Sequence, residues 1–479
     1  MTDPPACAPS PIRFGTSGWR GILGEEFTLP RARAVVRGVA EWVSAGQPGA
    51  RVLVAHDTRL LGERLACEAA SVLAAAGLRV GRARGPVPTP ALAHAVRRRR
   101  AAAGLVFTAS HNPPEYQGLK LVTRTGAAAP PEVTREIETR ARAWLGREPP
   151  RAVAKGAVEI LEAYRADLLG RLDVRVLRGS GLQVIHDALH GAGAGVLDAV
   201  LGRAGVSVRV RRGEPDPGFG GESPDPEGPR LTPLAAELRQ GRGLRLGVAT
   251  DGDGDRFAVV DAGGRILDAS EALALLLDHL IRTGRVEKGV VLASPVGSLP
   301  ELVAEWHGLR VERVPVGFKH LARAVEAGRL DAAGDESGGF AFGGFGLDKD
   351  GILSAALFAE LSATLGAPLG RRLSELTRKL GPHAWGRRAV PTSPAARERL
   401  LALEASPPQR VGRAAVRSVD AGDGLRLTLG DGFLHWRASG TEPLIRIYAE
   451  ADSQPVLETR LRAGERLLGG GWRRVGASR

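Results

Sequence analysis

Short apolar runs alternate with amphipathic stretches along the first part of the chain. Three of these runs have the length and composition of buried strands: residues 51–55, 78–81 and 104–107. The segments between them, 63–76 and 90–98, carry apolar residues at helical spacing, and Gly77 follows the first as a natural C-cap. Strands that alternate with helices predict a mostly parallel, doubly wound sheet, which binds ligands at the carboxyl ends of its strands.

The same alternation continues through the middle of the chain. Further strands are expected at residues 182–187, 244–249 and 289–293. Helices are expected at 196–204 and 271–283. The pattern therefore predicts three α/β units of similar size.

After residue 381 the pattern changes. Segments 416–429 and 432–450 alternate like antiparallel strands, and 455–468 is a helix candidate. Stretches 147–152 and 381–396 have the composition of linkers. We expect three α/β domains with mixed or parallel sheets and a small α+β C-terminal domain. The predicted boundaries are 1–150, 151–262, 263–380 and 381–479.

Composition points to a globular protein of the cytoplasm. Hydrophobic residues make up 43% and charged residues 25% of the chain. No apolar run approaches the ~20 residues of a membrane helix, and the first residues do not resemble a secretory signal. Two cysteines, Cys7 and Cys67, are too few for a disulfide framework or a four-ligand zinc site.

The chain is strongly basic, with a formal net charge of +13. Such a charge suits either nucleic acid or a small phosphorylated substrate. The basic residues are scattered and most are arginine, so we expect a small phosphorylated partner, no nucleic acid and no membrane. Of the six lysines, Lys120, Lys319 and Lys349 fall within the motifs described below.

A cluster of aspartates follows the strand expected at 244–249. Asp251, Asp253 and Asp255 alternate with glycines, and like charges so close together usually need a cation. Oxygen ligands of this kind suit a hard ion such as Mg²⁺. A Ca²⁺ EF-hand loop does not fit, because its sixth and twelfth positions hold Arg256 and Ala262. An acidic surface turn is the alternative.

A serine loop follows the strand expected at 104–107. In Thr108-Ala-Ser-His-Asn-Pro113, Ser110 could act as a nucleophile or phosphoryl carrier, and the prolines restrict the loop. The loop lacks the Gly-x-Ser-x-Gly pattern of a hydrolase elbow, and the chain has no Walker A loop. Lys120 is close enough in sequence to turn back towards Ser110. An ordinary turn remains the alternative.

Four later segments carry groups suited to a phosphorylated sugar, although each could also be a simple turn. Arginine, hydroxyl and glycine together can cradle a phosphate, and a carboxylate can hold sugar hydroxyls. The segments are Gly317–His320, Glu336–Gly339, Lys349–Gly351 and Arg437–Thr441.

Taken in order, these segments resemble the α-D-phosphohexomutase superfamily. The resemblance runs from Phe14 to about Glu450 and rests on these motifs: Phe14-Gly-Thr-Ser-Gly-Trp-Arg-Gly21, Asp57-Thr-Arg59, Pro88-Thr-Pro90, Thr108-Ala-Ser-His-Asn-Pro113, Asp251-Gly-Asp-Gly-Asp-Arg256, Glu336-Ser-Gly-Gly339 and Arg437-Ala-Ser-Gly-Thr-Glu-Pro443. It implies four domains around a central cleft. One departure is Gln117, where the superfamily often has Asn.

The resemblance also implies a role for each matching residue. Ser110 corresponds to a phosphoserine that ligates Mg²⁺ together with Asp251, Asp253 and Asp255. The residues implied around the phosphoryl group are Arg20, His111, Lys120 and Arg256. Those implied in substrate binding are Gly317, Lys319, His320, Glu336, Ser337, Lys349, Arg437, Ser439, Gly440 and Thr441.

The activity implied is interconversion of hexose 1-phosphate and hexose 6-phosphate through glucose 1,6-bisphosphate or mannose 1,6-bisphosphate. We expect Lys120 to be the general acid–base, with its pKa lowered by the cations Arg20 and Arg256, and His111 to be the alternative. Glucose or mannose phosphate is the expected substrate. Phosphoglucosamine mutase, phosphopentomutase, a phosphatase and a non-catalytic basic protein on a mutase fold are the alternatives, and monomer and dimer are both open.

Overall fold

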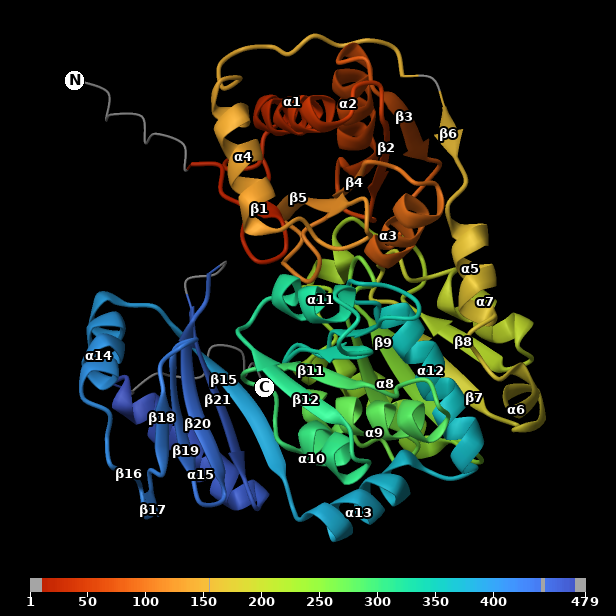
Figure 1. The fold of residues 1–479 in the computed structure, drawn as a ribbon. Coiled ribbons are helices and arrows are strands. Elements are labelled where there is room, and N and C mark those ends of the chain that lie inside the picture. Colours follow the sequence, from red (N-terminus) through yellow and green to blue (C-terminus); the bar gives the residue numbers. More distant parts are fainter. Residues whose placement is uncertain (1–10, 155, 441–443, 470–479) are drawn as a thin grey trace. The chain divides into compact units, whose positions relative to one another are not determined.

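The computed structural model describes residues 11–154, 156–440 and 444–469, which form two compact units. The first unit runs to Leu267 and also contains Gly339–Leu369. The second unit comprises Asp268–Gly338 and the chain from Gly370 onward. Both units are thus built from segments that are separate in sequence (Figure 1).

The first unit begins with a six-stranded mixed sheet. Its strands in spatial order are β1 (Trp19–Ile22), β5 (Tyr116–Thr123), β4 (Ala103–Phe107), β2 (Arg51–His56), β3 (Arg79–Ala83) and β6 (Ala157–Val158). The central strands β4, β2 and β3 are parallel, whereas β5 is antiparallel to both of its neighbours. The predicted doubly wound core is therefore confirmed, and β5 brings its residues back beside β4.

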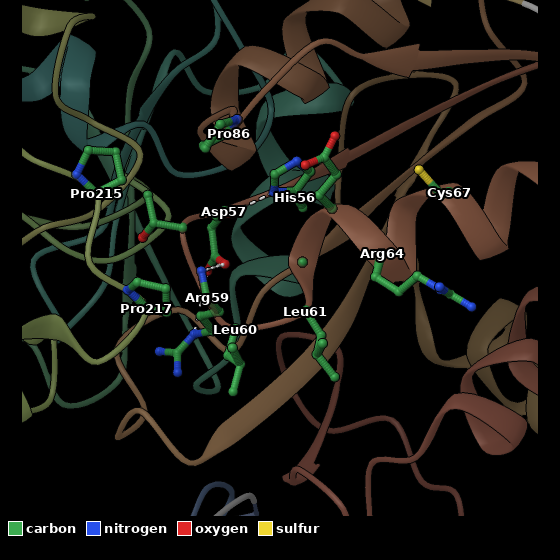
Figure 2. Close-up of a pocket in the computed structure, with 13 residues that line it drawn as sticks. His56, Asp57, Arg59, Leu60, Leu61, Arg64, Cys67, Pro86, Pro215 and Pro217 are labelled. Carbon is green, nitrogen blue, oxygen red and sulfur yellow. Dashed lines mark hydrogen bonds and ion pairs between the residues drawn. The ribbon is translucent and has the colours of Figure 1, made fainter.

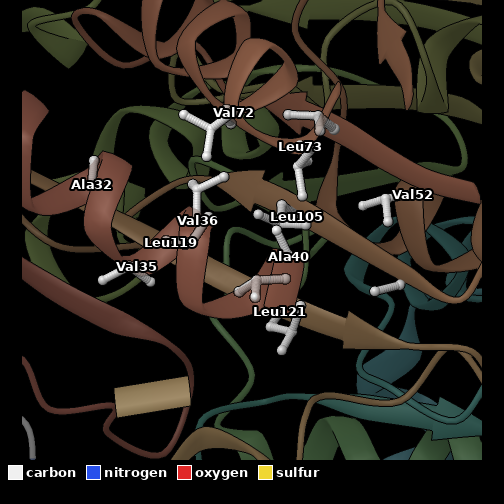
Figure 3. Packing of buried hydrophobic residues seen from close by; sticks show 14 of the residues in the cluster. Ala32, Val35, Val36, Ala40, Val52, Val72, Leu73, Leu105, Leu119 and Leu121 are labelled. Atoms are coloured by element: carbon white, nitrogen blue, oxygen red, sulfur yellow. The ribbon is translucent and has the colours of Figure 1, made fainter. Parts of the chain in front are cut away.

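Four helices belong to this sheet: α1 (Leu29–Gly46), α2 (Gly62–Ala75), α3 (Thr89–Arg98) and α4 (Pro131–Arg142). Apolar side chains of α1 and α2, such as Val36 and Val72, pack with Leu105 and Leu119 of the sheet in one buried cluster (Figure 3). Burial of each such side chain contributes about 1.5–3 kcal/mol to stability. The cluster supports the sheet that carries the loop after β4.

A second, four-stranded sheet completes the α/β part of the first unit. Its order is β10 (Phe257–Asp261), β9 (Arg245–Thr250), β7 (Gln183–Asp187) and β8 (Ser207–Arg211). Its helices are α5 (Leu161–Leu169), α6 (Val174–Gly179), α7 (Leu197–Arg203), α8 (Thr232–Gln240) and α12 (Gly351–Leu365). The short elements are η1 (Phe219–Gly221), η2 (Gly228–Leu231) and β14 (Phe340–Phe342). Because α12 packs on β9 and β10, it brings the preceding residues, including Lys349, into the first unit.

The second unit starts with parallel strands β12 (Arg310–Val314), β11 (Gly289–Ala293) and β13 (Ala332–Gly334). Its helices are α9 (Ala269–Arg282), α10 (Leu299–Trp306), α11 (Phe318–Glu326) and most of α13 (Leu369–Leu380). Helix α9 begins at a capping box: the Asp268 carboxylate accepts a hydrogen bond from N of Glu271, whose carboxylate accepts one from N of Asp268. This cap explains why the helix starts before residue 271.

The end of the second unit is an antiparallel five-stranded sheet. Its order is β15 (Ala384–Pro391), β21 (Leu444–Ala451), β20 (Gly432–Ala438), β19 (Leu425–Leu429) and β18 (Ser418–Asp420). The remaining elements are α14 (Pro394–Ala405), α15 (Gln454–Leu467), β16 (Arg410–Val411) and β17 (Ala414–Ala415). The predicted α+β C-terminal part is confirmed, but the linker predicted at 381–396 is wrong, since β15 occupies half of it and α14 begins within it.

Among the described residues, no single helix is both long and apolar enough to cross a membrane. Helices α12 and α13 meet that test of length and composition only when they are joined as a bent pair.

Candidate active site

Ser110 lies in the loop between β4 and β5, at the carboxyl end of a central strand. Its side chain is almost fully buried and its φ is +55°, a left-handed conformation that is uncommon for a residue other than glycine. Its backbone N donates to Oγ1 of Thr108 at 2.8 Å, and its Oγ donates to Oδ2 of Asp251 at 2.7 Å. The loop thus holds the Ser110 hydroxyl against the aspartate cluster.

Arg59, in the segment between β2 and α2, holds this loop in place. Its side chain is fully buried and its Nε lies 3.4 Å from Oδ2 of Asp57, also fully buried. The guanidinium stacks on the Phe219 ring, with 4.8 Å between Cζ and the ring centroid. It also donates to four backbone carbonyls at 2.6–3.0 Å: those of Ser110, Asn112, Pro113 and Tyr116. Sequence reasoning did not single out Arg59 as a site residue, although its motif was noted.

A cavity of about 570 Å³ lies beside Asp57 and Arg59 (Figure 2). Leu60, Pro215 and Pro217 form much of its apolar wall. Burial raises the pKa of Asp57 to about 6, although the neighbouring Arg59 acts to lower it. The ion pair is therefore held in a strongly desolvating environment.

The three aspartates of the loop after β9 come together as predicted. Asp251, Asp253 and Asp255 are all buried, and each offers a carboxylate oxygen within 4.8 Å of the others. Burial, followed by the charges of Asp255 and Asp253, raises the pKa of Asp251 well above its usual range. In the described part of the chain, the Oδ1 atoms of Asp253 and Asp255 have no hydrogen-bond partner. Buried carboxylate oxygens of this kind fit a hard divalent cation such as Mg²⁺.

The serine loop and the aspartate loop approach each other closely at Gly252. A Cβ atom on this residue would lie 2.7 Å from the carbonyl oxygen of Ser110 and 3.0 Å from Cγ of Pro224. Both distances are below ordinary van der Waals contact. Glycine is therefore needed here for the Ser110 hydroxyl to reach Asp251.

Two lysines neutralise part of the acidic cluster. Nζ of Lys120, on β5, donates to Oδ2 of Asp253 at 2.6 Å and to Oδ2 of Asp255 at 2.5 Å. Nζ of Lys349 lies 3.5 Å from Oδ1 of Asp255. Burial opposes ionisation of Asp255, but the positive charges of Lys120, Lys349 and Arg256 together outweigh it and lower the pKa of this carboxyl below its usual range.

Our expectation for the pKa of Lys120 is wrong in this arrangement. We predicted that nearby cations would lower it. Burial and Arg20 do act in that direction, but the carboxylates of Asp253 and Asp255, which accept hydrogen bonds from Nζ, outweigh them and raise the pKa of Lys120 above its usual range. In this arrangement Lys120 is a protonated partner of the aspartates.

Arg20 and Arg256 lie around the same cluster. Nη1 of Arg20, on β1, donates to Oδ1 of Asn112 at 2.5 Å. Burial, followed by the charge of Arg256, lowers the pKa of Arg20 from its usual value. The backbone N of Arg256 donates to Oδ1 of Asp251 at 3.1 Å, and its Nη1 lies 3.8 Å from a carboxylate oxygen of Asp225.

His111 follows Ser110 directly. Its Nδ1 lies 3.4 Å from Oγ of Ser110, and its carbonyl oxygen accepts a hydrogen bond from Oγ of Ser223 at 2.8 Å. The imidazole is therefore within reach of the serine hydroxyl, as is needed for proton transfer.

The other predicted site residues lie in the second unit. Gly317, with a φ of +127°, caps α11, whose first turn holds Lys319 and His320. Burial, followed by the charge of Lys319, lowers the pKa of His320. These residues stand where β12 gives way to α11, the position predicted for a ligand-binding loop of a parallel sheet.

Glu336 and Ser337 follow β13. The Glu336 side chain is buried, and burial, followed by the charge of Asp335, raises its pKa. Its carbonyl oxygen accepts a hydrogen bond from Nη1 of Arg387 at 3.2 Å, and the charges of Arg387 and Arg437 partly stabilise its carboxylate. Ser337 donates from Oγ to Oδ1 of Asp335 at 2.7 Å.

The predicted phosphate loop begins with the last two residues of β20, Arg437 and Ala438. Nε of Arg437 donates to Oδ1 of Asp423 at 2.9 Å, and the backbone N of Ser439 donates to the carbonyl oxygen of Leu444 at 2.8 Å. Apart from its neighbours in the chain, no described residue lies within 4 Å of the position that a Cβ on Gly440 would take. Thr441 lies outside the described residues.

The predicted residues thus fall into two groups. The group in the first unit contains Arg20, Ser110, His111, Lys120, Asp251, Asp253, Asp255, Arg256 and Lys349. Lys349 was predicted to bind substrate, and it joins this group through its ion pair with Asp255. The group in the second unit contains Gly317, Lys319, His320, Glu336, Ser337, Arg437, Ser439 and Gly440.

Comparison with known proteins matches almost the whole chain. Residues 11–146, 162–264 and 268–380 match the phosphoglucomutase/phosphomannomutase alpha/beta/alpha domains I, II and III, and residues 387–465 match the C-terminal domain. A "Phosphoglucomutase/phosphomannomutase" of Thermococcus kodakarensis is 31% identical, over 95% of this chain and 98% of its own length. A "Phosphoglucosamine mutase" of Frankia alni is 32% identical, over 92% of this chain and 95% of its own length.

A solved structure agrees with these matches. The crystal structure of a candidate phosphomannomutase from Thermus thermophilus has a TM-score of 0.85 and 32% sequence identity to this chain, and the match covers 96% of this chain and 100% of that one.

Proposed function

Because this chain belongs to the phosphoglucomutase/phosphomannomutase family of the α-D-phosphohexomutase superfamily, we propose that it interconverts hexose 1-phosphate and hexose 6-phosphate with Ser110 as phosphoryl carrier. Its relatives are phosphomutases, which are isomerases. One observation carries the proposal: the buried Ser110 hydroxyl lies 2.7 Å from Asp251, within a cluster that combines three aspartates with Lys120 and Arg20.

In the first step, a free hydroxyl oxygen of the sugar phosphate attacks phosphorus on phosphorylated Ser110. The bond between Oγ and phosphorus breaks, and a bisphosphorylated sugar forms. The hydroxyl proton passes to a protein base, and Oγ of Ser110 regains a proton. We propose His111, whose Nδ1 lies 3.4 Å from Oγ, as the proton carrier. Lys120, which we expected from the sequence to have this role, is held protonated by Asp253 and Asp255 and would act as a base only after that ion pair is broken.

The second step is the reverse reaction at the other phosphate. The bisphosphate, glucose 1,6-bisphosphate in the leading case, turns over and presents its other phosphate to Ser110. Oγ gives up its proton and attacks that phosphorus, and the bond between phosphorus and the sugar oxygen breaks. The sugar oxygen takes up a proton, the phosphoserine has reformed, and the sugar monophosphate leaves as product. Arg20 and Arg256 supply positive charge around the transferring group.

The ligand set of Ser110, Asp251, Asp253 and Asp255 fits Mg²⁺, as argued from the buried Oδ1 atoms of Asp253 and Asp255, which have no hydrogen-bond partner among the described residues. When bound, the ion would offset negative charge on the transferring phosphoryl group.

We propose that the second-unit residues bind the sugar phosphate. Arg437, Ser439, Gly440 and Thr441 would hold the phosphate that is not transferred. Those proposed to orient the sugar are Gly317, Lys319, His320, Glu336 and Ser337. Glucose and mannose phosphates are the leading substrates. Glucosamine phosphate is a second candidate because the Frankia alni relative carries that name.

A substrate comparison separates these candidates. Turnover is measured with glucose, mannose and glucosamine 1-phosphates under equal conditions. Activity on glucosamine 1-phosphate alone would contradict glucose and mannose phosphates as the leading substrates. Release of free phosphate would identify a phosphatase. No turnover together with salt-sensitive oligonucleotide binding would favour the non-catalytic alternative.

Replacing Ser110 with Ala tests the carrier. We expect the intact wild-type protein to carry a phosphoryl mass of about 80 Da, and Ser110→Ala to lack this mass and to lose mutase turnover. Ser180→Ala is the control, because Ser180 bonds locally to Leu177. A folded Ser110→Ala protein with wild-type turnover would contradict the proposal.

We also propose that the enzyme works in the cytoplasm, where the thiol of Cys67 remains reduced. The domain boundaries predicted from the sequence remain predictions.

A further inference from the structure

Asp423 lies in the turn between β18 and β19, and none of the sequence motifs contains it. Its carboxylate contacts two distant segments of the second unit. Oδ2 accepts a hydrogen bond from the backbone N of Val316 at 2.7 Å, and Oδ1 accepts one from Nε of Arg437 at 2.9 Å. Val316 directly precedes Gly317, so Asp423 joins the start of the proposed sugar-orienting loop to the proposed phosphate-binding arginine.

The turn that carries Asp423 is itself fixed on β20. The next residue, Gly424, has a φ of +82°, and a Cβ there would collide with the carbonyl oxygen of Trp436. The carbonyl oxygen of Asp423 accepts a hydrogen bond from Nε2 of the buried His435 at 2.7 Å. The Asp423 carboxylate therefore has little freedom to move relative to the strand that carries Arg437.

Charge and geometry both favour an aspartate at this position. Its side chain and that of Arg437 are 15% and 17% exposed, so the ion pair is largely shielded from water. Each carboxylate oxygen faces a hydrogen-bond donor, and a charged acceptor makes such bonds short and strong. An amide would turn an N–H group towards one of the two donors and lose that bond.

We infer that Asp423 is a positioning residue that fixes the guanidinium of Arg437 relative to the loop beginning at Val316. The two segments that bind the sugar phosphate are then held at a fixed distance from each other. Asp423 affects binding by positioning these segments. The inference rests on the proposed function, since that function makes these two segments the binding site.

The test compares Asp423→Asn with wild-type enzyme. We expect KM for the hexose 1-phosphate to rise about 10–100-fold through loss of a charge-assisted hydrogen bond, with kcat changing less than about threefold. The Mg²⁺-induced rise in Tm and the phosphorylation of Ser110, read from the intact mass, should stay as in wild type because both belong to the first unit.

Asp420→Asn is the matched control. Asp420 lies on the same edge of the sheet and accepts a hydrogen bond from the backbone N of Gly422 at 2.8 Å, within its own turn. We expect its KM to stay within twofold of wild type. If Asp423→Asn does not fold, the smaller Asp423→Ser removes the same carboxylate and carries the same expectation.

Three results would overturn the inference. The first is a KM for the Asp423 variant within twofold of that for Asp420→Asn. The second is a fall in kcat with KM unchanged. The third is full additivity of Asp423→Asn with Arg437→Lys, because a residue acting through Arg437 should matter less once Arg437 is changed. Wild-type enzyme with no turnover would contradict the proposed function, and the inference with it, before any variant is made.

Discussion

Replacing Arg59 tests how the serine loop is held. In Arg59→Met the guanidinium is lost while most of the side-chain length is kept. Four backbone carbonyls of the loop lose their donor, and the fully buried Asp57 loses its cationic partner. The stacking contact with Phe219 also disappears.

The size of the effect follows from these contacts. Removing one partner of a buried ion pair costs about 3–5 kcal/mol, because the other charge stays buried without compensation. For a domain of 150–250 residues, each kcal/mol lowers Tm by about 2–4 °C. We therefore expect the thermal transition of the first unit to fall by about 6–20 °C.

The assay is thermal unfolding by circular dichroism, with mutase turnover measured on the same samples. Arg64→Met is the matched control, since Arg64 is close in sequence, has a 61% exposed side chain and pairs with Glu68 on the helix surface. Arg64→Met should lower the free energy of unfolding by less than about 1 kcal/mol. Adding Asp57→Asn to Arg59→Met should cost less than the sum of the two single changes, because it removes the stranded charge.

Two results would refute this reasoning. One is a Tm for Arg59→Met no lower than that for Arg64→Met. The other is full additivity of Asp57→Asn and Arg59→Met, which would mean that the buried pair does not act as a pair.

Three further changes test other parts of the molecule. We expect MgCl₂ to raise the Tm of the wild-type protein and Asp253→Asn to abolish that rise, and an unchanged rise would exclude Asp253 as a ligand. Gly252→Ala should lower kcat about 10–100-fold, because its Cβ would push the Ser110 carbonyl, 2.7 Å away, out of position; wild-type kinetics would contradict the close approach. The hydrogen bond to Glu450 raises the pKa of His383 above 6.5. Stability from this pair is therefore complete below pH 6.5 and is lost as pH rises through the raised pKa. His383→Gln should flatten that part of the Tm–pH curve, and an unaltered curve would contradict the assignment.

The sequence determined the features that depend on local pattern. Residues 51–55 and 104–107 were predicted as strands, and they are β2 and β4 with small changes at their ends. Ser110 follows β4, and Asp251 follows β9. Because the carboxyl ends of parallel strands carry the ligand-binding loops, their role as candidate site residues could be inferred before their distance was known. The cation site could be predicted from the spacing of the three aspartates alone.

Strand β15 shows where local pattern was insufficient. Its sequence, Ala384–Pro391, contains a glycine, two arginines and a terminal proline, which are typical of a linker. It lies at the edge of the sheet and pairs with β21, and edge strands tolerate such residues. Pairing with a strand far along the chain decided its conformation.

Tertiary structure alone decided the contacts of Arg59, Lys120, Lys349 and Asp423. Arg59 and Asp423 bind backbone groups far away in sequence. Because a backbone group is not specific to a residue type, the identity of the partner residue does not reveal such a contact. The sign of the Lys120 pKa shift depends on distances of 2.6 and 2.5 Å to two carboxylates, which outweigh burial and Arg20. Electrostatic energy falls with separation. The sequence can therefore identify the charged residues, but only their distances in the folded chain determine which of them has the largest effect on the pKa.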